Sequence, residues 1–263
     1  MGLSTRFRFR LGWRRRTKYK IRSAKAQIYK KEKEKKTMAA TKKTEETIEI
    51  RPLDIRKATL RIVGDTPLIM HAWSEKAKRM MLEAQQGKSK GKKKPVKNPV
   101  DDFIQSAYWL TGKPEYPDNA TEEECAAAFD EAIANGATFG FPVTAVKQAA
   151  ISAAYRLGWV KNQMGLRGAF FIKGDQNGMV QIHSDVPVMR EDMVKVGLGT
   201  ADIRYRAQFN NWWAELNISY NSSGGFSLEN IVNAINAGGY VCGLGEWRPE
   251  RDGDYGQFHV AVQ

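Results

Sequence analysis

The sequence predicts an α+β fold in which helices pack against an antiparallel sheet. Three observations lead to this prediction. The 263 residues are 42% hydrophobic, which is enough for one large or two small domains with a buried core. Strand-like stretches alternate with amphipathic helices, but without the strict strand–helix–strand repetition of a parallel sheet. No apolar stretch approaches the roughly 20 residues that span a bilayer. A ferredoxin-like core carrying insertions fits this order of elements.

The first half of the chain begins with a strand and continues with a short capped helix. The strand is predicted within residues 47–63, where apolar and polar residues alternate. Ser74 begins a helix that extends to about residue 86. A loop follows, because six lysines between Lys88 and Lys97 lie among glycines and a proline. This loop is either solvated or in contact with phosphates.

The next helices are recognised by their ends. Thr121 and Glu124 form a capping box for an acidic helix that ends at Gly136. A helix with a stripe of small apolar residues is predicted over residues 140–158. Residues 168–183 are expected to form a β-hairpin, and residues 184–206 are expected to be irregular.

The last part of the chain contains the clearest strand. Between residues 212 and 220, apolar side chains alternate strictly with polar ones: Trp212, Ala214, Leu216, Ile218 and Tyr220. Ser227 then begins a helix that is expected to stop at Gly238 and Gly239. A glycine-rich loop and a final strand complete this part.

Positive charge is confined to the beginning of the chain. The net charge is +13, but residues 1–37 contain 15 Lys and Arg with 2 Glu, whereas residues 38–263 contain 27 basic and 27 acidic residues. We therefore predict a basic, disordered arm over residues 1–45 and a domain over residues 46–263, with insertions at 87–137 and 160–206. Because the domain is neutral, a nucleic-acid site on it must be a local patch.

Three interpretations of the arm stay open. Its basic and aromatic residues suit contact with nucleic acid, in which Phe7, Phe9, Trp13 and Tyr19 stack on bases. Its arginine-rich, acid-poor composition also suits a targeting peptide. Alternatively, the native protein begins at Met38 and the arm is not part of it.

The sequence contains none of the common motifs for metal, nucleotide or hydrolase chemistry. His71, His183, His259, Cys125 and Cys242 are not at metal-ligand spacing, so we expect no metal and no cofactor. Two distant cysteines and the lack of a secretory signal favour a reducing cytoplasm and no membrane association. His71 follows the first strand region and is the candidate for a general base in RNA cleavage.

The glycine-rich loop lies between a helix and the final strand. A dinucleotide-binding fingerprint would lie between a strand and the following helix, so the context excludes it. Its glycines permit positive φ and let another backbone approach. Their amides either cradle phosphates, or the loop is a hairpin with Trp247 in the core. Four acids oppose a phosphate cradle unless they pair with arginines: Glu246, Glu250, Asp252 and Asp254.

The order of these motifs resembles the RAMP superfamily, the RNA-binding proteins of CRISPR effector complexes, and especially its backbone subunits. GDTPLIMHAW (64–73) is similar to the family's early strand. FPVTAVKQAAI (141–151) resembles its proline–glycine–serine segment that opens a helix, although Val143, Gln148 and Ile151 replace two glycines and an arginine. GLGEWRPERDGDYGQF (243–258) resembles its terminal glycine-rich loop. The chain is also similar to uncharacterised proteins of bacteriophages and prophages.

The resemblance implies a ferredoxin-like or RRM-like core that binds single-stranded RNA or DNA across its sheet and glycine loop. It implies a homo-oligomer assembled along the strand through a thumb-like β-hairpin at 168–183 or 190–206, in a bacterial host cytoplasm if a phage encodes it. The residues expected at the nucleic acid are Lys147, Arg167, Arg204, Arg206, Gly243, Gly245, Trp247, Arg248, Arg251, Tyr255 and Gly256, with Lys92, Lys93 and Lys94 adding non-specific affinity.

Two other functions stay open. A metal-independent endoribonuclease would use His71, since a few members of the resembled family cut RNA with an Asp or a His. A phage structural or inhibitor protein would keep the fold and bind protein, which the neutral charge of residues 38–263 favours.

Overall fold

The computed structural model describes residues 25–36, 50, 52–88, 96–197 and 199–261. The chain divides into two units, residues 53–263 and residues 1–52, and the first of these contains the compact domain. In the latter unit, residues 25–36 form an exposed helix, so the prediction of disorder is wrong for them. They are mostly Lys, Glu, Ala and Gln, which favour helices, and Glu32 and Lys36 have the spacing of a stabilising pair. Phe7, Phe9, Trp13 and Tyr19 lie outside the described residues.

The central sheet of the compact unit has ferredoxin-like topology. Strands β1 (Ile55–Gly64), β5 (Phe170–Lys173), β9 (Trp213–Asn221) and β10 (Phe258–Val260) pair antiparallel in the order β10-β1-β9-β5. Helix α5 (Val143–Arg156) precedes β5, and helix α7 (Leu228–Val241) joins β9 to β10. This β-α-β-β-α-β order, with the first and third strands in the centre, defines the ferredoxin-like fold. The predicted α+β class is confirmed.

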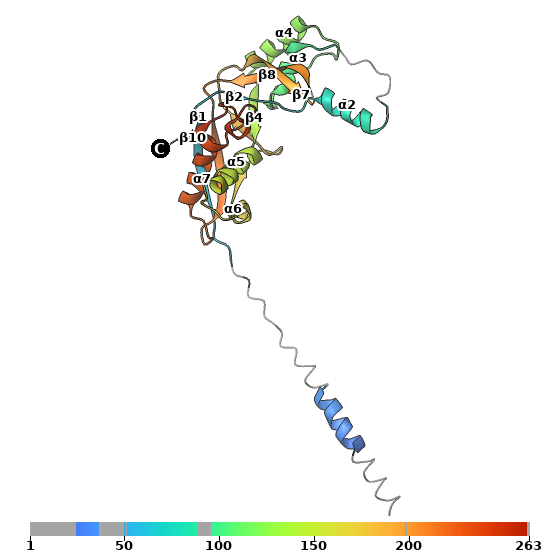
Figure 1. Ribbon diagram of the computed structural model, residues 1–263, viewed down its shortest axis with the longest axis vertical. Helices are drawn as coiled ribbons and strands as arrows, with labels where there is room; N and C mark the ends of the chain where they lie inside the picture. Colours follow the sequence, from blue (N-terminus) through green and yellow to red (C-terminus); the bar gives the residue numbers. More distant parts are fainter. Residues whose placement is uncertain (1–24, 37–49, 51, 89–95, 198, 262–263) are drawn as a thin grey trace, which may run out of the picture. The chain divides into compact units, whose positions relative to one another are not determined.

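Helices α5 and α7 pack against each other and cover one face of this sheet (Figure 1). The predicted small-residue stripe of α5 is buried, with Val146, Ala150 and Ala153 at most 1% exposed. The alternation predicted in β9 is confirmed as well, because Ala214, Leu216 and Ile218 are at most 1% exposed. The hydrophobic core therefore lies between the two helices and one face of the sheet.

Helix α7 does not stop at Gly238 and Gly239, as the sequence predicts, but continues to Val241. A Cβ on Gly238 would lie 2.7 Å from the backbone nitrogen of Ala150 in α5. A Cβ on Gly239 would overlap the carbonyl oxygen of Phe258 in β10. The two glycines are needed because they let α7 touch both neighbours, which outweighs their poor helix propensity.

The first inserted segment joins β1 to α5 and spans residues 65–142, where the sequence predicts an insertion at 87–137. Ser74, Asn98 and Thr121 cap its helices, and the predicted capping box at Thr121 is confirmed. Helix α3 and strand β3 are too short to carry a clear periodic signal, and the sequence does not predict them. The elements are β2 (Leu68–Ile69), α2 (Glu75–Gln85), α3 (Pro99–Ser106), β3 (Trp109–Thr111), α4 (Glu122–Ala134) and β4 (Thr138–Pro142).

The hairpin predicted over residues 168–183 is wrong. Helix α6 (Gln163–Ala169) leads into β5, and the chain then turns, with the Gly178 amide donating to the Asp175 carbonyl at 3.0 Å. However, β5 pairs with β9 in the central sheet, whereas β6 (Met179–Ile182) pairs with β4 in a second sheet of order β3-β4-β6. The two strands therefore join different sheets on either side of the turn, although their apolar side chains contribute to the same hydrophobic core.

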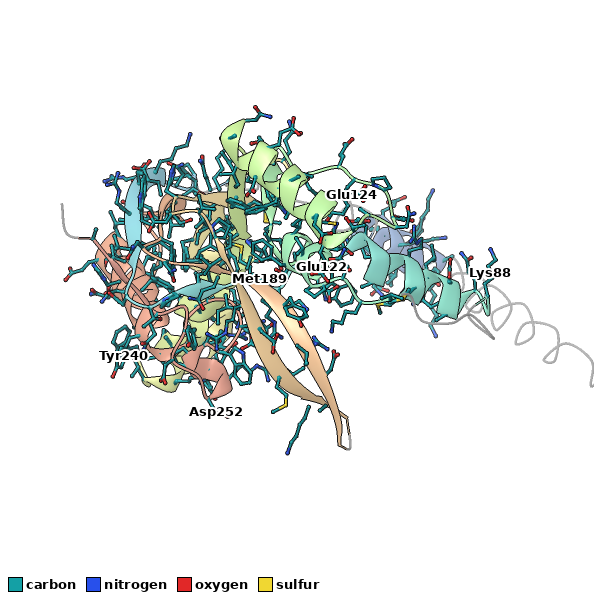
Figure 2. The ribbon with its side chains drawn as sticks, turned by 90° about the horizontal axis from the view of Figure 1, so that it is seen from above. Lys88, Glu122, Glu124, Met189, Tyr240 and Asp252 are labelled. Carbon is teal, nitrogen blue, oxygen red and sulfur yellow. The ribbon has the colours of Figure 1, made fainter. Side chains whose placement is uncertain are left out.

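Residues 184–206 are not irregular, as predicted, but contain most of the longest hairpin. Strand β7 (Val188–Val196) pairs antiparallel with β8 (Thr200–Phe209), and β2 completes this third sheet. The hairpin extends away from the rest of the unit in Figure 2. Its outer part has no covered face, and Met193 and Ile203 are exposed there. Without a buried face, the sequence lacks the alternation that identifies a strand.

We predict that Gly239→Ala destabilises the fold by about 1–3 kcal/mol or more, because the new methyl group overlaps the Phe258 carbonyl. In thermal unfolding followed by circular dichroism, the midpoint should fall by several degrees. Gly168→Ala is the control, since a methyl group on Gly168 would meet no atom within 4 Å. Equal midpoints for the two variants would refute the close approach of α7 to β10.

Candidate nucleic-acid interface

The glycine-rich loop folds back on its own chain. Gly243, Gly245 and Gly256 have φ angles of 66°, 74° and 68°. A Cβ on Gly245 would overlap the Ile69 carbonyl oxygen, and a Cβ on Gly256 would overlap that of Leu244. The Leu244 amide donates to Gly256 at 2.9 Å. These glycines therefore admit the protein's own backbone, and their close contacts are already occupied within the fold.

Two of the four acids of the loop pair with arginines. Glu250 accepts hydrogen bonds from Arg156 at 3.1 Å and from Arg248 at 3.0 Å. Arg248 also donates to the Gly245 carbonyl at 2.9 Å. Arg251 is exposed and forms no ion pair within the described part of the chain. Of the two loop arginines expected at phosphates, only Arg251 keeps its charge free for a ligand.

Arg206 is buried and serves the fold. Its side chain is 4% exposed, and its guanidinium donates to Asp192, whose side chain is 5% exposed, at 3.0 Å. Arg206 also lies 3.4 Å from Glu246, and Arg190 donates to Asp192 at 2.8 Å. Arg206 is expected at phosphates, but its guanidinium is held inside the fold by Asp192 and Glu246 and is not exposed to a ligand in this structure.

Hydrogen bonds keep two acids of this cluster charged. Burial raises the pKa of the Asp192 carboxyl. Hydrogen bonds from Arg190, Arg206 and Trp247 together lower it by more than burial raises it, so the pKa lies below its ordinary value. For Glu246, the hydrogen bond with His71 lowers the pKa by more than burial raises it. Both carboxylates are therefore ionised at neutral pH and hold their arginines in place.

His71 lies in a small cleft between β2, α5 and the glycine loop. The cleft has a volume of about 230 Å³ and is also lined by Tyr108, Gln148 and Glu246. His71 Nδ1 is 3.6 Å from Glu246 Oε1 and 3.3 Å from the Arg206 guanidinium. No group of three His, Cys, Asp or Glu suited to a metal occurs among the described residues. The cleft therefore offers a carboxylate-oriented histidine for proton transfer.

The two aromatic residues of the loop differ in how accessible they are. The Tyr255 hydroxyl accepts a hydrogen bond from Arg190 at 2.9 Å, and the Arg190 guanidinium lies 4.5 Å from the Tyr255 ring centroid. Trp247 has a positive φ of 53° and is 38% exposed, so it is not in the core. Of the two, Trp247 is the more accessible for stacking.

The other predicted basic residues lie apart from the glycine loop. Lys147 is in α5, with its Nζ 4.2 Å from the Phe171 ring centroid, and burial lowers the pKa of its ammonium group. Arg167 is in α6 and donates to Gln163 at 3.0 Å. Arg204 is in β8 and pairs with Asp202 at 3.4 Å. Lys92, Lys93 and Lys94 lie outside the described residues.

The sequence analysis missed the face of the central sheet that carries no helix. Cross-strand partners there form rows, with Lys57 and Phe171 both opposite Ser219, and Thr59 and Lys173 both opposite Asn217. Phe171 is 59% exposed. Alternation could have found this face, because Lys57, Thr59 and Arg61 lie on the opposite side of β1 from the apolar Leu60 and Ile62.

Arg61 and Trp213 form a stack at one end of this face. The Arg61 guanidinium lies 4.3 Å from the Trp213 ring centroid and donates to Glu215 at 3.1 Å. The Trp213 ring is stacked on His183 with centroids 3.9 Å apart and planes 9° apart. Cation–π and ring stacking fix these side chains, which forms a flat, partly polar surface beside Thr59 and Asn217.

No protein-family model matches the sequence, and the curated proteins include none that is significantly similar to it. Among solved structures, the chain is similar to "Crystal structure of Cmr6 from Pyrococcus furiosus", with 10% sequence identity and a TM-score of 0.30. The match covers 80% of this chain and 100% of that chain. A likeness with so low an identity and TM-score supports no conclusion about what the chain binds. No described helix has the length and apolar character that a membrane span requires.

We predict that Asp192→Ala lowers the free energy of unfolding by about 3–5 kcal/mol, because it leaves buried Arg206 without its carboxylate. Asp202→Ala, which removes two half-exposed ion pairs, with Arg204 and with Lys97, should cost less than about 1 kcal/mol for each pair. Urea unfolding at pH 7 measures both.

The same pair gives a pH dependence. Because the folded pKa of Asp192 is lowered, its stabilisation is present above the unfolded pKa of about 4 and is lost as pH falls through the folded value. Wild type should therefore lose more stability between about pH 4 and pH 2 than Asp192→Ala. Parallel acid profiles for the two proteins would contradict the role assigned to this pair.

Proposed function

We propose that this protein binds single-stranded nucleic acid on the helix-free face of its central sheet. The observation that supports the proposal best is Phe171, an exposed aromatic ring with the Lys147 ammonium 4.2 Å from its centroid. Lys173 is two residues further along the same strand, and Lys57 lies in the same cross-strand row, beyond Ser219. Stacking of a base on an aromatic side chain contributes about 1–3 kcal/mol and works with any base. The nearby lysines would contact the phosphates on either side of the stacked base.

The face favours an unpaired strand over a duplex. Bases of a duplex are stacked on each other, so an aromatic ring on an open sheet can reach only bases that are unpaired. The charges on this face are Lys57, Arg61 and Lys173 against Glu215, with His259 of β10 paired to Asp65 at its edge, in a domain whose total charge is zero. This local excess is the kind of patch that a neutral domain needs to attract phosphates.

The finer parts of the proposal stay predictions. They are the choice between RNA and DNA, assembly along the strand, a relation to the RAMP superfamily and to bacteriophage proteins, and a cytoplasmic location. Arg251 and Trp247 of the glycine loop are the residues that would extend the surface, since both are exposed. The β7–β8 hairpin is the candidate for contact with a second copy, because Met193 and Ile203 are exposed on it.

We predict that Phe171→Ala weakens binding of a fluorescein-labelled U12 oligonucleotide about tenfold or more, as expected when one stacked base loses its platform. Fluorescence anisotropy at low salt measures the affinity. Tyr240→Ala is the matched control, because Tyr240 is a more exposed aromatic side chain, 76%, on the helical side of the sheet. Equal affinities for the two variants would overturn the assignment of this face.

A salt series tests the lysines of the same face. Lys57→Gln with Lys173→Gln should reduce the slope of log K against log salt by roughly 0.7 for each phosphate that is no longer neutralised. Lys78→Gln with Lys113→Gln removes the same charge from another part of the unit and should leave the slope unchanged. If residues 38–263 bind no oligonucleotide even at about 50 mM salt, the proposed function is wrong.

A metal-independent endoribonuclease is the second candidate. It is favoured by the position of His71, which is 31% exposed in a cleft and oriented by Glu246 at 3.6 Å. A histidine held by a carboxylate can transfer a proton between a ribose 2′-hydroxyl and the leaving oxygen. The cleft is open beside the glycine loop, where an RNA backbone could enter.

We predict that, if this activity exists, His71→Ala lowers the single-turnover cleavage rate of labelled RNA in EDTA by about 100-fold or more, the usual contribution of a general base. His259→Ala is the control, because His259 is an exposed histidine paired with Asp65, away from the cleft. Equal cleavage by wild type and both variants would exclude this second candidate.

A further inference from the structure

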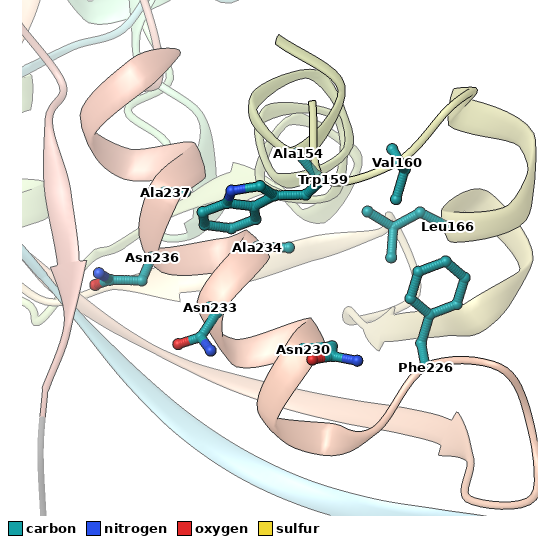
Figure 3. Close-up of a pocket in the computed structure, with 10 residues that line it drawn as sticks. All are labelled: Ala154, Trp159, Val160, Leu166, Phe226, Asn230, Asn233, Ala234, Asn236 and Ala237. Carbon is teal, nitrogen blue, oxygen red and sulfur yellow. The ribbon is translucent and has the colours of Figure 1, made fainter. Parts of the chain in front are cut away.

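The helical layer contains an open pocket that no part of the proposed function uses. It lies between α5, α6 and α7 and has a volume of about 480 Å³ (Figure 3). Its apolar wall includes Leu166, Trp159 and Phe226. Pockets of about 300–1,000 Å³ with apolar walls and a few polar groups are typical small-molecule sites.

Aromatic rings border the pocket on two sides. Trp159 follows Gly158, whose φ of 73° ends α5 and turns the chain toward α6. The indole of Trp159 is 55% exposed, and Figure 3 shows it over α7, with Phe226 on the other side of the pocket. An indole that is exposed in this way beside an apolar recess is available to stack on a planar group.

The polar wall consists of amides only. Asn230, Asn233 and Asn236 recur every three residues along α7 and therefore share one face of this helix. Asn236 accepts a hydrogen bond from the Val260 amide at 2.8 Å. The side chains of Asn230 and Asn233 form no hydrogen bond within the described residues, and no charged side chain lines the pocket.

These features identify a class of ligand. A primary amide offers a donor and an acceptor side by side, which matches the N6 and N7 edge of adenine. The aromatic rings match the faces of a base, and the lack of a cation gives no partner for a phosphate. We propose that the pocket binds a neutral purine base, with adenine as the match. The base comes either from a free nucleoside or from an unpaired position of a strand.

Isothermal titration calorimetry with adenosine, uridine and AMP tests the proposal on the full chain. Adenosine should bind at least about tenfold more tightly than uridine, and AMP no more tightly than adenosine. Asn233→Leu should weaken adenosine binding about tenfold or more, because leucine cannot form the two hydrogen bonds of an amide with adenine. Tyr240→Leu, on the same helix but outside the pocket, should leave it unchanged. Absence of adenosine binding at millimolar concentration would overturn the proposal, as would equal affinity for uridine.

The two sites can be tested separately, because Phe171 is in β5 and does not line the pocket. The control is needed because Asn233 also lines a recess with Thr59 and Arg61 at the edge of the sheet. Phe171→Ala should keep adenosine binding, and Asn233→Leu should keep U12 binding. Competition then identifies the source of the base: adenosine should displace A12 but not U12 if a strand supplies the adenine. Adenosine binding without any such competition assigns the pocket to the free nucleoside. A loss of U12 binding in Asn233→Leu would show that the pocket is not a separate site.

Discussion

The buried ion pair between Arg206 and Asp192 connects parts of the chain that are far apart in sequence. Asp192 is in β7 and Arg206 in β8, so the pair first closes the hairpin across its two strands. Arg206 then reaches Glu246 in the glycine loop, and Arg190 reaches Tyr255 near the end of the chain. A buried charge is tolerated only when it is paired and hydrogen-bonded. The hairpin and the loop must therefore fold together.

This constraint explains the composition of the glycine loop. Four acids would weaken a phosphate cradle, but Glu246 and Glu250 pair with arginines, and Asp252 ends a short 3-10 turn with a φ of 59°. The loop glycines accommodate β2 and the loop's own backbone. Both features maintain the compact structure of the loop. The loop therefore has the composition of a phosphate-binding site, but most of its polar groups already bind other groups of the protein.

Much of the fold could be predicted from local signals, because they have local causes. The alternation of β9, the stripe of α5 and the caps at Ser74 and Thr121 depend only on nearby residues. The partners of β5 and β6 could not be predicted, since both strands alternate in the same way and only the core decides which sheet each one joins. The burial of Arg206 could not be predicted either, because the hairpin contains three arginines and the sequence does not show which of them has a buried partner.

A ligand on the helix-free sheet face is favoured by the solvation of its charged side chains and not by a likeness to other proteins. Lys57, Arg61, Lys173 and Glu215 on this face cannot be buried under a third layer without a large loss of hydration. They must face water or a ligand that replaces water with charge, and a phosphate backbone does so while leaving Phe171 free to stack. The pocket on the helical side is different because it has no charge at all. One neutral domain thus separates a surface suited to a polyanion from a recess suited to an uncharged base.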